Sequence, residues 1–560
     1  MRSAVGPVLW PEISARPDPS VVLRPAHQLG AYYTPSVTAS FMADWAIRAG
    51  DERVLEPSMG DGQFLRAVTS HAARRDFNGV QVWGVELDSD TYRLTVGGGV
   101  VEPERAILGN FLDVVPFPVN VVIGNPPYVR LRHLPQDEAD HARATASQAL
   151  GMRMDPAGSV WLPFVTHTTN FIELGGRLAF VLPYDFTYVR YAKPLWRFLG
   201  REYGSLRVVR VRERLFPDIL QEVVLLLADD RGGRSNAVQF DCYEKPLDLL
   251  DAEPSRSTRV ALDRIVTDDR PFTEALLPDV LRELLHTRLA RLTQPVSDYV
   301  TWNIGYVTGD KRFFHPSEED VEEFNLPASS LVPSLASGRR AAKKGLRTSG
   351  FPQSSIARLF LPSESEGDLT EGERAYIQVG VSRGVERRYK CRIREPWYVT
   401  PGVKIPDLLM PVFADRPALF VNDGGFAASN SMLAGYLHGG SQGHAIAAWY
   451  TSLTLLQIEL NVHSLGGGVM VLVPREVGAI RTPILSSTEH LEAVGRHLGA
   501  GDTVAAYRSG DAPVLGGSLG LTPSQVELIH GGVEILRRWR MPNARRVDQS
   551  QEEVVLCEDA

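Results

Sequence analysis

Short apolar runs alternate with helix-like stretches between residue 31 and about residue 230, and this alternation most constrains the fold. Apolar residues recur at helical spacing in Pro35–Arg48 and Gln63–Arg75. Four runs that each end in polar or glycine residues have the character of buried strands: RVLEPS (53–58), VQVWGVELD (80–88), RAILGN (105–110) and VNVVIGN (119–125). Strand–helix alternation of this kind predicts an α/β domain with a mainly parallel sheet.

The chain beyond this core predicts further strands and then a change of character. Residues 175–183 predict a fifth strand, and residues 206–216 and 222–230 predict two neighbouring strands that close the sheet edge. The organisation that we expect is an N-terminal arm at 1–30, a first domain at 31–245 that ends in a linker at 231–245, a helical connector at 246–295, a second domain at 296–480, and a C-terminal helical region and tail at 481–560.

Three strand ends carry residues suited to a nucleoside. The turn from Glu56 to Gly62 follows a strand and opens a helix, and its glycines let the backbone pass close to a ligand. Glu86 ends the next strand, where a carboxylate can hold ribose hydroxyls. Asn110 can pair with an adenine edge while Phe111 packs on its ring. Together they predict a pocket for an adenosine-containing cofactor, and the missing G-x-x-x-x-G-K-[ST] motif argues against a triphosphate.

The fourth strand ends in Gly124-Asn125-Pro126-Pro127-Tyr128, the most specific motif of the chain. Its two prolines fix the backbone and remove donors, which leaves carbonyl groups directed at a ligand. The Asn125 side chain and the Pro126 carbonyl can then accept hydrogen bonds from one exocyclic amino group. Tyr128 offers a flat face for a base.

These motifs resemble γ-class DNA adenine-N6 methyltransferases, the modification enzymes of type II restriction–modification systems. The resemblance covers about residues 31–230, and one departure is Asn110, where many relatives carry Asp. The matching positions, in chain order, are Tyr33-Thr34-Pro35, Glu56 to Gly62, Glu86, Asn110-Phe111, Asn125-Pro126-Pro127-Tyr128 and Phe216-Pro217.

The resemblance implies a class I, Rossmann-like methyltransferase fold that binds S-adenosyl-L-methionine. It implies that Asn125 and Pro126 hold the adenine amine for direct in-line methyl transfer, and that Tyr128 and Phe216 sandwich an adenine flipped out of duplex DNA. The cofactor-binding residues that it implies are Tyr33, Thr34, Pro35, Glu56, Pro57, Gly60, Gly62, Glu86, Asn110 and Phe111.

The second half resembles the target-recognition region of this family, which implies a mixed α/β recognition domain. Its landmarks are Gly305–Asp310 with Phe313-Phe314, Trp397-Tyr398, Asn422–Leu433 and the glycine-rich Ser464–Pro474. Three basic clusters also lie in this half: Arg339, Arg340, Lys343, Lys344 and Arg347; Arg383, Arg387, Arg388, Lys390, Arg392 and Arg394; and Arg537, Arg538, Arg540, Arg545 and Arg546. Basic residues interleaved with aromatic ones suit contact with DNA. For the third cluster taken alone, a solvated charged face is the better interpretation.

Composition limits the remaining classes. The net charge of −8 gives no general basic surface, so DNA binding depends on the local clusters. Three cysteines far apart in sequence, no secretory signal and no long apolar run predict a cytoplasmic protein without a membrane segment. No histidine motif predicts a metal site, and a monomer is expected.

The main hypothesis is a site-specific double-stranded DNA adenine-N6 methyltransferase that protects DNA from a separate cognate restriction endonuclease. No nuclease motif precedes Tyr33, so the chain itself is not expected to cut DNA. Two alternatives stay open: a methyltransferase that acts on RNA or on protein glutamine, and a non-catalytic DNA-binding subunit of an antiviral defence complex.

Overall fold

A computed structural model describes residues 34–216, 221–335, 345–352, 354, 356–439, 441–465, 468–484 and 487–541. The expected arm at 1–30 and Tyr33 lie outside the described residues. The chain divides into two compact units, Met1–Ala275 and Leu276–Ala560. No helix within the described ranges has the length and apolar character needed to cross a bilayer. In the same ranges, no three His, Cys, Asp or Glu side chains are grouped so that they could hold a metal ion.

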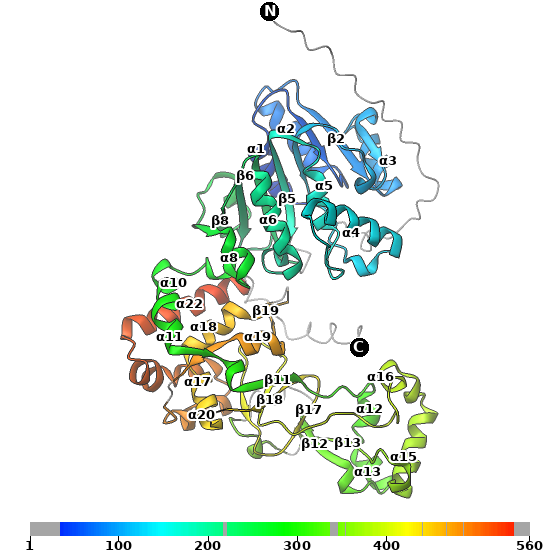
Figure 1. Cartoon of the computed structure of the whole chain (residues 1–560), viewed down its shortest axis with the longest axis vertical. Helices are drawn as coiled ribbons and strands as arrows, with labels where there is room; N and C mark the ends of the chain where they lie inside the picture. The colour runs from blue at the N-terminus through cyan, green and yellow to red at the C-terminus, as the bar shows by residue number, and fades with distance from the viewer. Residues whose placement is uncertain are drawn as a thin grey trace, which may run out of the picture. The chain divides into compact units, whose positions relative to one another are not determined.

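The first unit is built on a sheet with the strand order β3-β2-β1-β4-β5-β7-β6-β8-β9 among its described residues (Figure 1). β3, β2, β1, β4 and β5 are mutually parallel, which confirms the predicted α/β class. The strands are β1 (Arg53–Glu56), β2 (Gln81–Glu86), β3 (Ala106–Leu108), β4 (Val119–Gly124), β5 (Ile172–Pro183), β6 (Tyr203–Val211), β7 (Val223–Arg231), β8 (Ala237–Tyr243) and β9 (Arg256–Ala261).

Helices cover both faces of this sheet. Residues of α1, α2 and α7 form one core with alternate residues of β1, β4, β5, β6 and β7, such as Val54 and Val121. The intervening residues, such as Leu55 and Val122, point to the opposite face and are also fully buried. Figure 1 shows α5 and α6 on the near face. The helices are α1 (Ser36–Ala46), α2 (Gln63–Arg74), α3 (Ser89–Gly97), α4 (Gln136–Leu150), α5 (Trp161–Thr168), α6 (Lys193–Glu202), α7 (Asp248–Asp251), α8 (Leu262–Thr267) and α9 (Pro271–Glu274).

The sheet extends further than the sequence predicts. β7 lies antiparallel between β5 and β6, so the pair expected at the edge lies inside the sheet. The linker expected at 231–245 is wrong, because its residues 237–243 form β8, which pairs parallel with β6. The helical connector expected at 246–295 contains β9, which pairs with β8, and the boundary between the units falls inside it. Val238, Phe240 and Cys242 alternate along β8 and are buried against the core, which favours a strand, whereas the polar residues before β8 form a turn.

The second unit contains several small sheets, with the orders β11-β18-β14-β16, β13-β12-β17, β15-β20-β19 and β10-β21 in the described part of the chain. The strands are β10 (Thr293–Pro295), β11 (Val300–Ile304), β12 (Leu331–Leu335), β13 (Ala357–Phe360), β14 (Leu408–Pro411), β15 (Phe413–Ala414), β16 (Phe420–Val421), β17 (Ala427–Ala428), β18 (Met432–Leu437), β19 (His463–Ser464), β20 (Met470–Val471) and β21 (Arg481–Pro483). The helices are α10 (Asp279–Leu284), α11 (Ala290–Leu292), α12 (Lys311–Phe314), α13 (Glu318–Glu323), α15 (Glu371–Ser382), α16 (Tyr389–Arg392), α17 (Gln442–Trp449), α18 (Ser452–Asn461), α19 (Pro474–Ala479), α20 (Leu491–Gly499), α21 (Thr503–Arg508) and α22 (Pro523–Arg540).

An aromatic lobe of this unit combines β12, β13 and β17 with α12, α13, α15 and α16. Phe313 lies at its centre, with its ring stacked on Tyr376 at 5.0 Å between centroids and edge-on to Phe360. The Tyr376 hydroxyl donates to the Phe313 carbonyl at 2.7 Å. Aromatic pairs of this geometry add to the stability gained from burial alone. The predicted Phe313-Phe314 motif is therefore part of a core.

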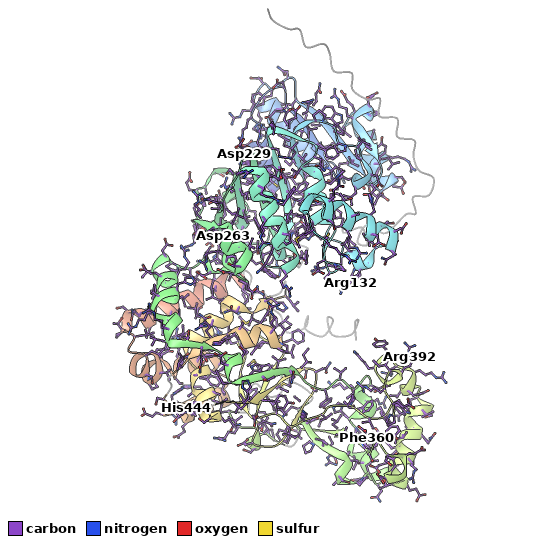
Figure 2. All side chains as sticks on the ribbon, viewed as in Figure 1. Arg132, Asp229, Asp263, Phe360, Arg392 and His444 are labelled. Atoms are coloured by element: carbon purple, nitrogen blue, oxygen red, sulfur yellow. The ribbon has the colours of Figure 1, made fainter. Side chains whose placement is uncertain are left out.

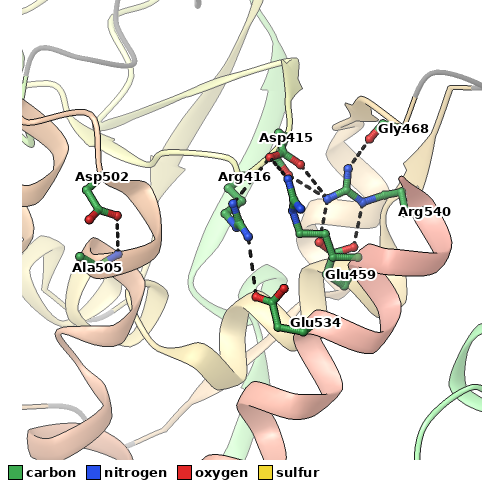
Figure 3. Close-up of polar contacts among 9 residues, drawn as sticks. Asp415, Arg416, Glu459, Gly468, Asp502, Ala505, Glu534 and Arg540 are labelled. Atoms are coloured by element: carbon green, nitrogen blue, oxygen red, sulfur yellow. Dashed lines mark hydrogen bonds and ion pairs between the residues drawn. The ribbon is translucent and has the colours of Figure 1, made fainter. Parts of the chain in front are cut away.

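A buried ion network joins α22 to α18, β15 and the glycine-rich segment before β20 (Figure 3). Arg540 donates to both carboxylate oxygens of Glu459 at 2.8 Å and to Asp415 at 3.0 Å, and it also donates to the Gly468 carbonyl. Arg537 donates to the other Asp415 oxygen at 2.8 Å. Because these arginines are neutralised inside the protein, the expectation of a solvated face for the third basic cluster is wrong for them. Arg545 and Arg546 lie outside the described residues.

Candidate active site

The predicted motifs of the first four strands meet at one edge of the first unit. β1, β2, β3 and β4 are parallel neighbours, so their carboxyl ends lie along the same side of the sheet. The turn after β1 is held by specific contacts. Gly60 has a φ of +51° and Gly62 a φ of +78°, a region that favours glycine. An ideal Cβ at Gly60 would meet nothing within 4 Å, so the backbone borders open space there.

Glu86 ties this turn to the end of β2. One carboxylate oxygen accepts from the Gly60 amide at 2.9 Å, and the other accepts from the Asp88 amide at 2.9 Å. Burial raises the pKa of Glu86, although these backbone hydrogen bonds partly oppose the shift. Glu86 thus holds a predominantly buried carboxylate beside a glycine turn.

Glu56 ends β1 and is 2% exposed. Burial, followed by the negative charge of Asp61, raises the pKa of Glu56 well above its ordinary value. Its Oε2 atom is buried and has no hydrogen-bond partner among the described residues. A buried polar atom without a partner is costly in a protein interior, which points to a polar or cationic ligand at this position.

Asn125 lies after β4 at the centre of a hydrogen-bond network. The Tyr128 hydroxyl donates to Asn125 Oδ1 at 2.6 Å, and Asn125 Nδ2 donates to Thr34 Oγ1 at 3.5 Å. The Ser58 hydroxyl donates to the Asn125 carbonyl at 3.1 Å. Thr34, Ser58 and Tyr128 therefore converge on one residue, with Ser58 on its backbone carbonyl and the other two on its side-chain amide.

The prolines of the site act through packing. Pro35 immediately precedes α1 with a φ of −58°. Pro57 lies against Gly124: an ideal Cβ at Gly124 would come within 3.3 Å of the Pro57 Cδ atom. Pro126 is buried. These contacts bring the β1 turn and the β4 loop together and leave little freedom to either backbone.

Some residues that hold the loops of the site in place belong to no motif that the sequence analysis identified. Thr95 donates from Oγ1 to the Gly60 carbonyl at 2.6 Å, and Ser58 contacts Asn125 as described. Arg130, two residues after Tyr128, donates to Asp185 at 3.0 Å and to the Tyr191 hydroxyl at 2.9 Å. These contacts link the β4 loop to the segment after β5. A lone serine or threonine is common in turns, so only the fold identifies these residues.

Asn110 and Phe111 have structural partners in this chain. The Asn110 side chain accepts from the Leu112 amide at 3.1 Å and caps the short helix after β3. Phe111 is 1% exposed, and its ring packs against Phe164, His167 and Phe171 with centroids 5.0–5.2 Å apart. Protein side chains already enclose this ring, so its packing on the adenine of the cofactor stays a prediction.

Phe216 also lies in a core. It is 5% exposed and belongs to the cluster beneath α1 and α2, with Leu215 and Tyr243 among its members. This burial gives Phe216 a packing role in the core. Pro217 lies outside the described residues. Stacking of Phe216 on a base stays a prediction.

The basic clusters differ in their surroundings. Of the first cluster only Arg347 is described, and it pairs with Asp423 at 3.2 Å. In the second cluster Arg388 pairs with Asp310 at 2.8 Å, and Arg394 donates to the Thr308 carbonyl at 2.9 Å. The second cluster therefore lies against the predicted 305–310 segment.

Two family models match the chain, one on each unit. The model described as N-6 DNA methylase matches residues 23–194, and the model of the C-terminal domain of type II methyltransferase M.Eco57I matches residues 269–515. Among curated relatives, type II methyltransferase M.XamI of Xanthomonas campestris pv. amaranthicola is 23% identical over 82% of this chain and 86% of its own length. M.AccI of Acinetobacter calcoaceticus is 21% identical over 72% of this chain and 75% of its own length.

The solved structures agree on the fold. The type IIL restriction-modification enzyme MmeI, solved in complex with DNA, aligns with a TM-score of 0.54 at 11% identity, over 90% of this chain and 75% of that chain. At this identity the likeness is one of fold. The family matches, the relatives and the parallel sheet together confirm the resemblance found in the sequence. The chain belongs to the N6-adenine DNA methyltransferases of type II restriction–modification systems.

Proposed function

We propose that the pocket bordered by Glu56, Gly60 and Glu86 binds S-adenosyl-L-methionine, which supplies an electrophilic methyl group on a positively charged sulfur. The donor set fits this molecule. A buried and a partly buried carboxylate suit its positive charges and ribose hydroxyls, and Glu56 Oε2 has no hydrogen-bond partner among the residues that the structure describes. The open space beside Gly60 lets a ligand approach the backbone closely. Thr34, Pro35, Pro57, Gly62 and Asn110 would line or support the pocket.

We propose that Asn125 and the Pro126 carbonyl accept the two hydrogens of an adenine N6 amine. The network around Asn125 carries this proposal. The Asn125 side-chain nitrogen donates to Thr34 Oγ1, and Asn125 Oδ1 accepts from the Tyr128 hydroxyl. These two hydrogen bonds fix the orientation of the amide, with its oxygen toward Tyr128. A carbonyl oxygen can accept two hydrogen bonds, so Oδ1 can accept from the amine as well as from Tyr128. Two acceptors on one amine would localise its lone pair on nitrogen and make it a better nucleophile.

An adenine inside a duplex cannot reach a loop at a strand end, so it must leave the base stack. We assign the stacking face to Tyr128, which is half-buried beside Asn125. Stacking on an aromatic ring returns about 1–3 kcal/mol per base, against a flipping cost of a few kcal/mol. Phe216 would add a second face if its ring left the core. The second unit would select the DNA sequence.

Methylation of one short DNA sequence tests this function. The purified chain is incubated with unmethylated duplex DNA and methyl-labelled cofactor, and the products are digested to nucleosides. We expect label in N6-methyladenine at a single sequence, and none in the same DNA after full methylation. Label found only in RNA or in protein glutamine would overturn the proposal. Sequence-specific DNA binding without label would favour the non-catalytic subunit.

Such an enzyme would protect the DNA of its cell from a separate endonuclease of the same specificity. Comparing methylation across a genome with and without the gene would identify the sequence. DNA from the strain without the gene should be cut by that endonuclease, and DNA from the other strain should resist it. If the endonuclease cuts both DNAs, the enzyme does not protect DNA from that endonuclease.

Cofactor affinity should rise with pH. Burial raises the pKa of both Glu56 and Glu86, so in the ligand-free protein their contribution to stability is present at low pH and is lost as the pH rises through those values. A cationic ligand favours the carboxylates, so its binding releases protons above the ordinary pKa of 4.5. Calorimetry in two buffers of different ionisation enthalpy measures this release. Glu56→Gln should reduce it, and an unchanged release would exclude Glu56 from the pocket.

A further inference from the structure

The fold joins two segments of the second unit that lie far apart in sequence. Arg394 donates to the Val307 and Thr308 carbonyls, and Arg388 pairs with Asp310. Gly309, with a φ of +93°, lets the backbones approach, because an ideal Cβ there would lie 2.9 Å from the Lys390 Cβ. Residues 305–310 thus contact the residues on either side of α16 and fix the position of this helix on the aromatic lobe.

Exposed residues in and around α16, together with Val307, form a surface that we call the Tyr389 patch. Tyr389 is 62% exposed and Ile393 is 59% exposed, so two large apolar side chains lie close together in sequence at the surface. The patch comprises Val307, Arg387, Tyr389, Lys390, Arg392 and Ile393. Figure 2 labels Arg392 at the periphery of the lobe and Phe360 within it. Cys391 of α16 is buried in the aromatic core, whereas Tyr389 and Ile393 are exposed to solvent.

The charge of the patch is strongly positive. Between residues 386 and 394 there are five cations and one carboxylate, and that carboxylate, Glu386, pairs with Arg387 at 3.1 Å. Lys390 Nζ lies 5.5 Å and the Arg392 guanidinium 5.9 Å from the centroid of the Tyr389 ring. Neither Lys390 nor Arg392 forms an ion pair within the described part of the chain. Both cations therefore lie close to an exposed ring and are available to an anion.

We propose that the Tyr389 patch is a contact surface for duplex DNA, with Lys390 and Arg392 on phosphates and with Tyr389 and Ile393 against sugars or base edges. This inference rests on the proposed function, since it takes DNA as the substrate. Cations within 6 Å of an exposed ring match a polymer whose anionic backbone alternates with apolar sugar and base surfaces. Arg388 and Arg394 hold residues 305–310 and so act by positioning α16.

The salt dependence of DNA binding tests the phosphate contacts. The full chain and a Lys390→Gln/Arg392→Gln variant are titrated with a fluorescent duplex that contains the methylated sequence, between about 50 and 200 mM salt. Each lost phosphate contact reduces the slope of log K against log salt by about 0.9, so the variant should lose about 1.8. The control is Arg496→Gln/Arg508→Gln on α20 and α21, which removes the same charge from exposed positions and should keep the slope.

The Tyr389→Ala variant separates the contribution of the aromatic ring to DNA binding from that of the positive charges. It should weaken DNA binding by about tenfold while leaving the salt slope unchanged, because no phosphate contact is lost. Thermal unfolding checks that all variants are folded. Slopes and affinities equal to those of the control variant would overturn the proposal and assign the patch to another partner. Binding is measured without methyl transfer, so failure here is distinct from failure of the catalytic proposal, which leaves DNA bound but unmethylated.

Discussion

Replacing Asn125 with alanine is expected to lower the rate of methyl transfer by at least about 10²-fold, the effect of removing one preorganised polar contact to a reacting group. Cofactor affinity should stay nearly unchanged, since the carboxylates and the glycine turn are intact. The variant also loses the bond to Tyr128, so Tyr128→Phe is needed to separate the two effects. That change keeps the ring and removes one hydrogen bond, and should cost only about 2- to 10-fold.

The matched control is Asn78→Ala, an exposed asparagine in the turn before β2, at the opposite end of the strand from Glu86. Its activity should equal that of the unchanged protein. Single-turnover rates with labelled cofactor measure transfer, and equilibrium dialysis measures cofactor binding. If Asn125→Ala loses cofactor binding instead of transfer rate, then Asn125 belongs to the cofactor pocket, and the assignment of the adenine amine to this loop fails.

Glu86→Gln should weaken cofactor binding by about 10- to 100-fold, because hydrogen bonds to a charged group are worth about 1.5–3 kcal/mol. The substitution keeps the size of the side chain. The amide has one acceptor oxygen, however, so it cannot serve the Gly60 and Asp88 amides together. The glycine turn should therefore loosen at the same time as the ribose contact is lost.

Glu104→Gln provides the comparison, since Glu104 is an exposed carboxylate in the same unit, in the short helix before β3. Cofactor titration followed by tryptophan fluorescence or calorimetry gives both dissociation constants. Saturating cofactor should restore much of the transfer rate of Glu86→Gln, which separates it from Asn125→Ala. Equal affinity in the Glu86 and Glu104 variants would exclude Glu86 from cofactor binding.

The sequence predicted the parallel half of the sheet well, because short apolar strands that end in glycine, acid or amide residues are a strong local signal. The β1 turn, Glu86 and the β4 loop lie along one edge as expected. The prediction failed at β8 and β9. The polar residues 231–236 look like a linker, and only pairing with β6 on one side and β9 on the other shows that residues 237–243 form a strand of the sheet.

The site shows a second limit. A sequence motif identifies the type of a residue, but whether its side chain is accessible to a ligand depends on its burial in the fold. Phe111 and Phe216 have suitable rings for stacking, but both rings are enclosed by core side chains. Conversely, Ser58 and Thr95 hold the loops in place through single hydroxyl groups that no pattern distinguishes. Contacts between residues distant in sequence separate these cases.

The ion network at Arg540 bears on attempts to exchange specificity between related enzymes. Three segments more than 40 residues apart meet there: Asp415 and Glu459 each supply a carboxylate, and Arg540 supplies the guanidinium that pairs with both. A chimera that takes α18 from one parent and the final helix from another would leave Glu459 with no counter-ion inside the protein wherever the second parent lacks an arginine at this position, an arrangement that is strongly destabilising. Donor segments should therefore be transplanted as a set that carries Asp415, Glu459 and Arg540 together.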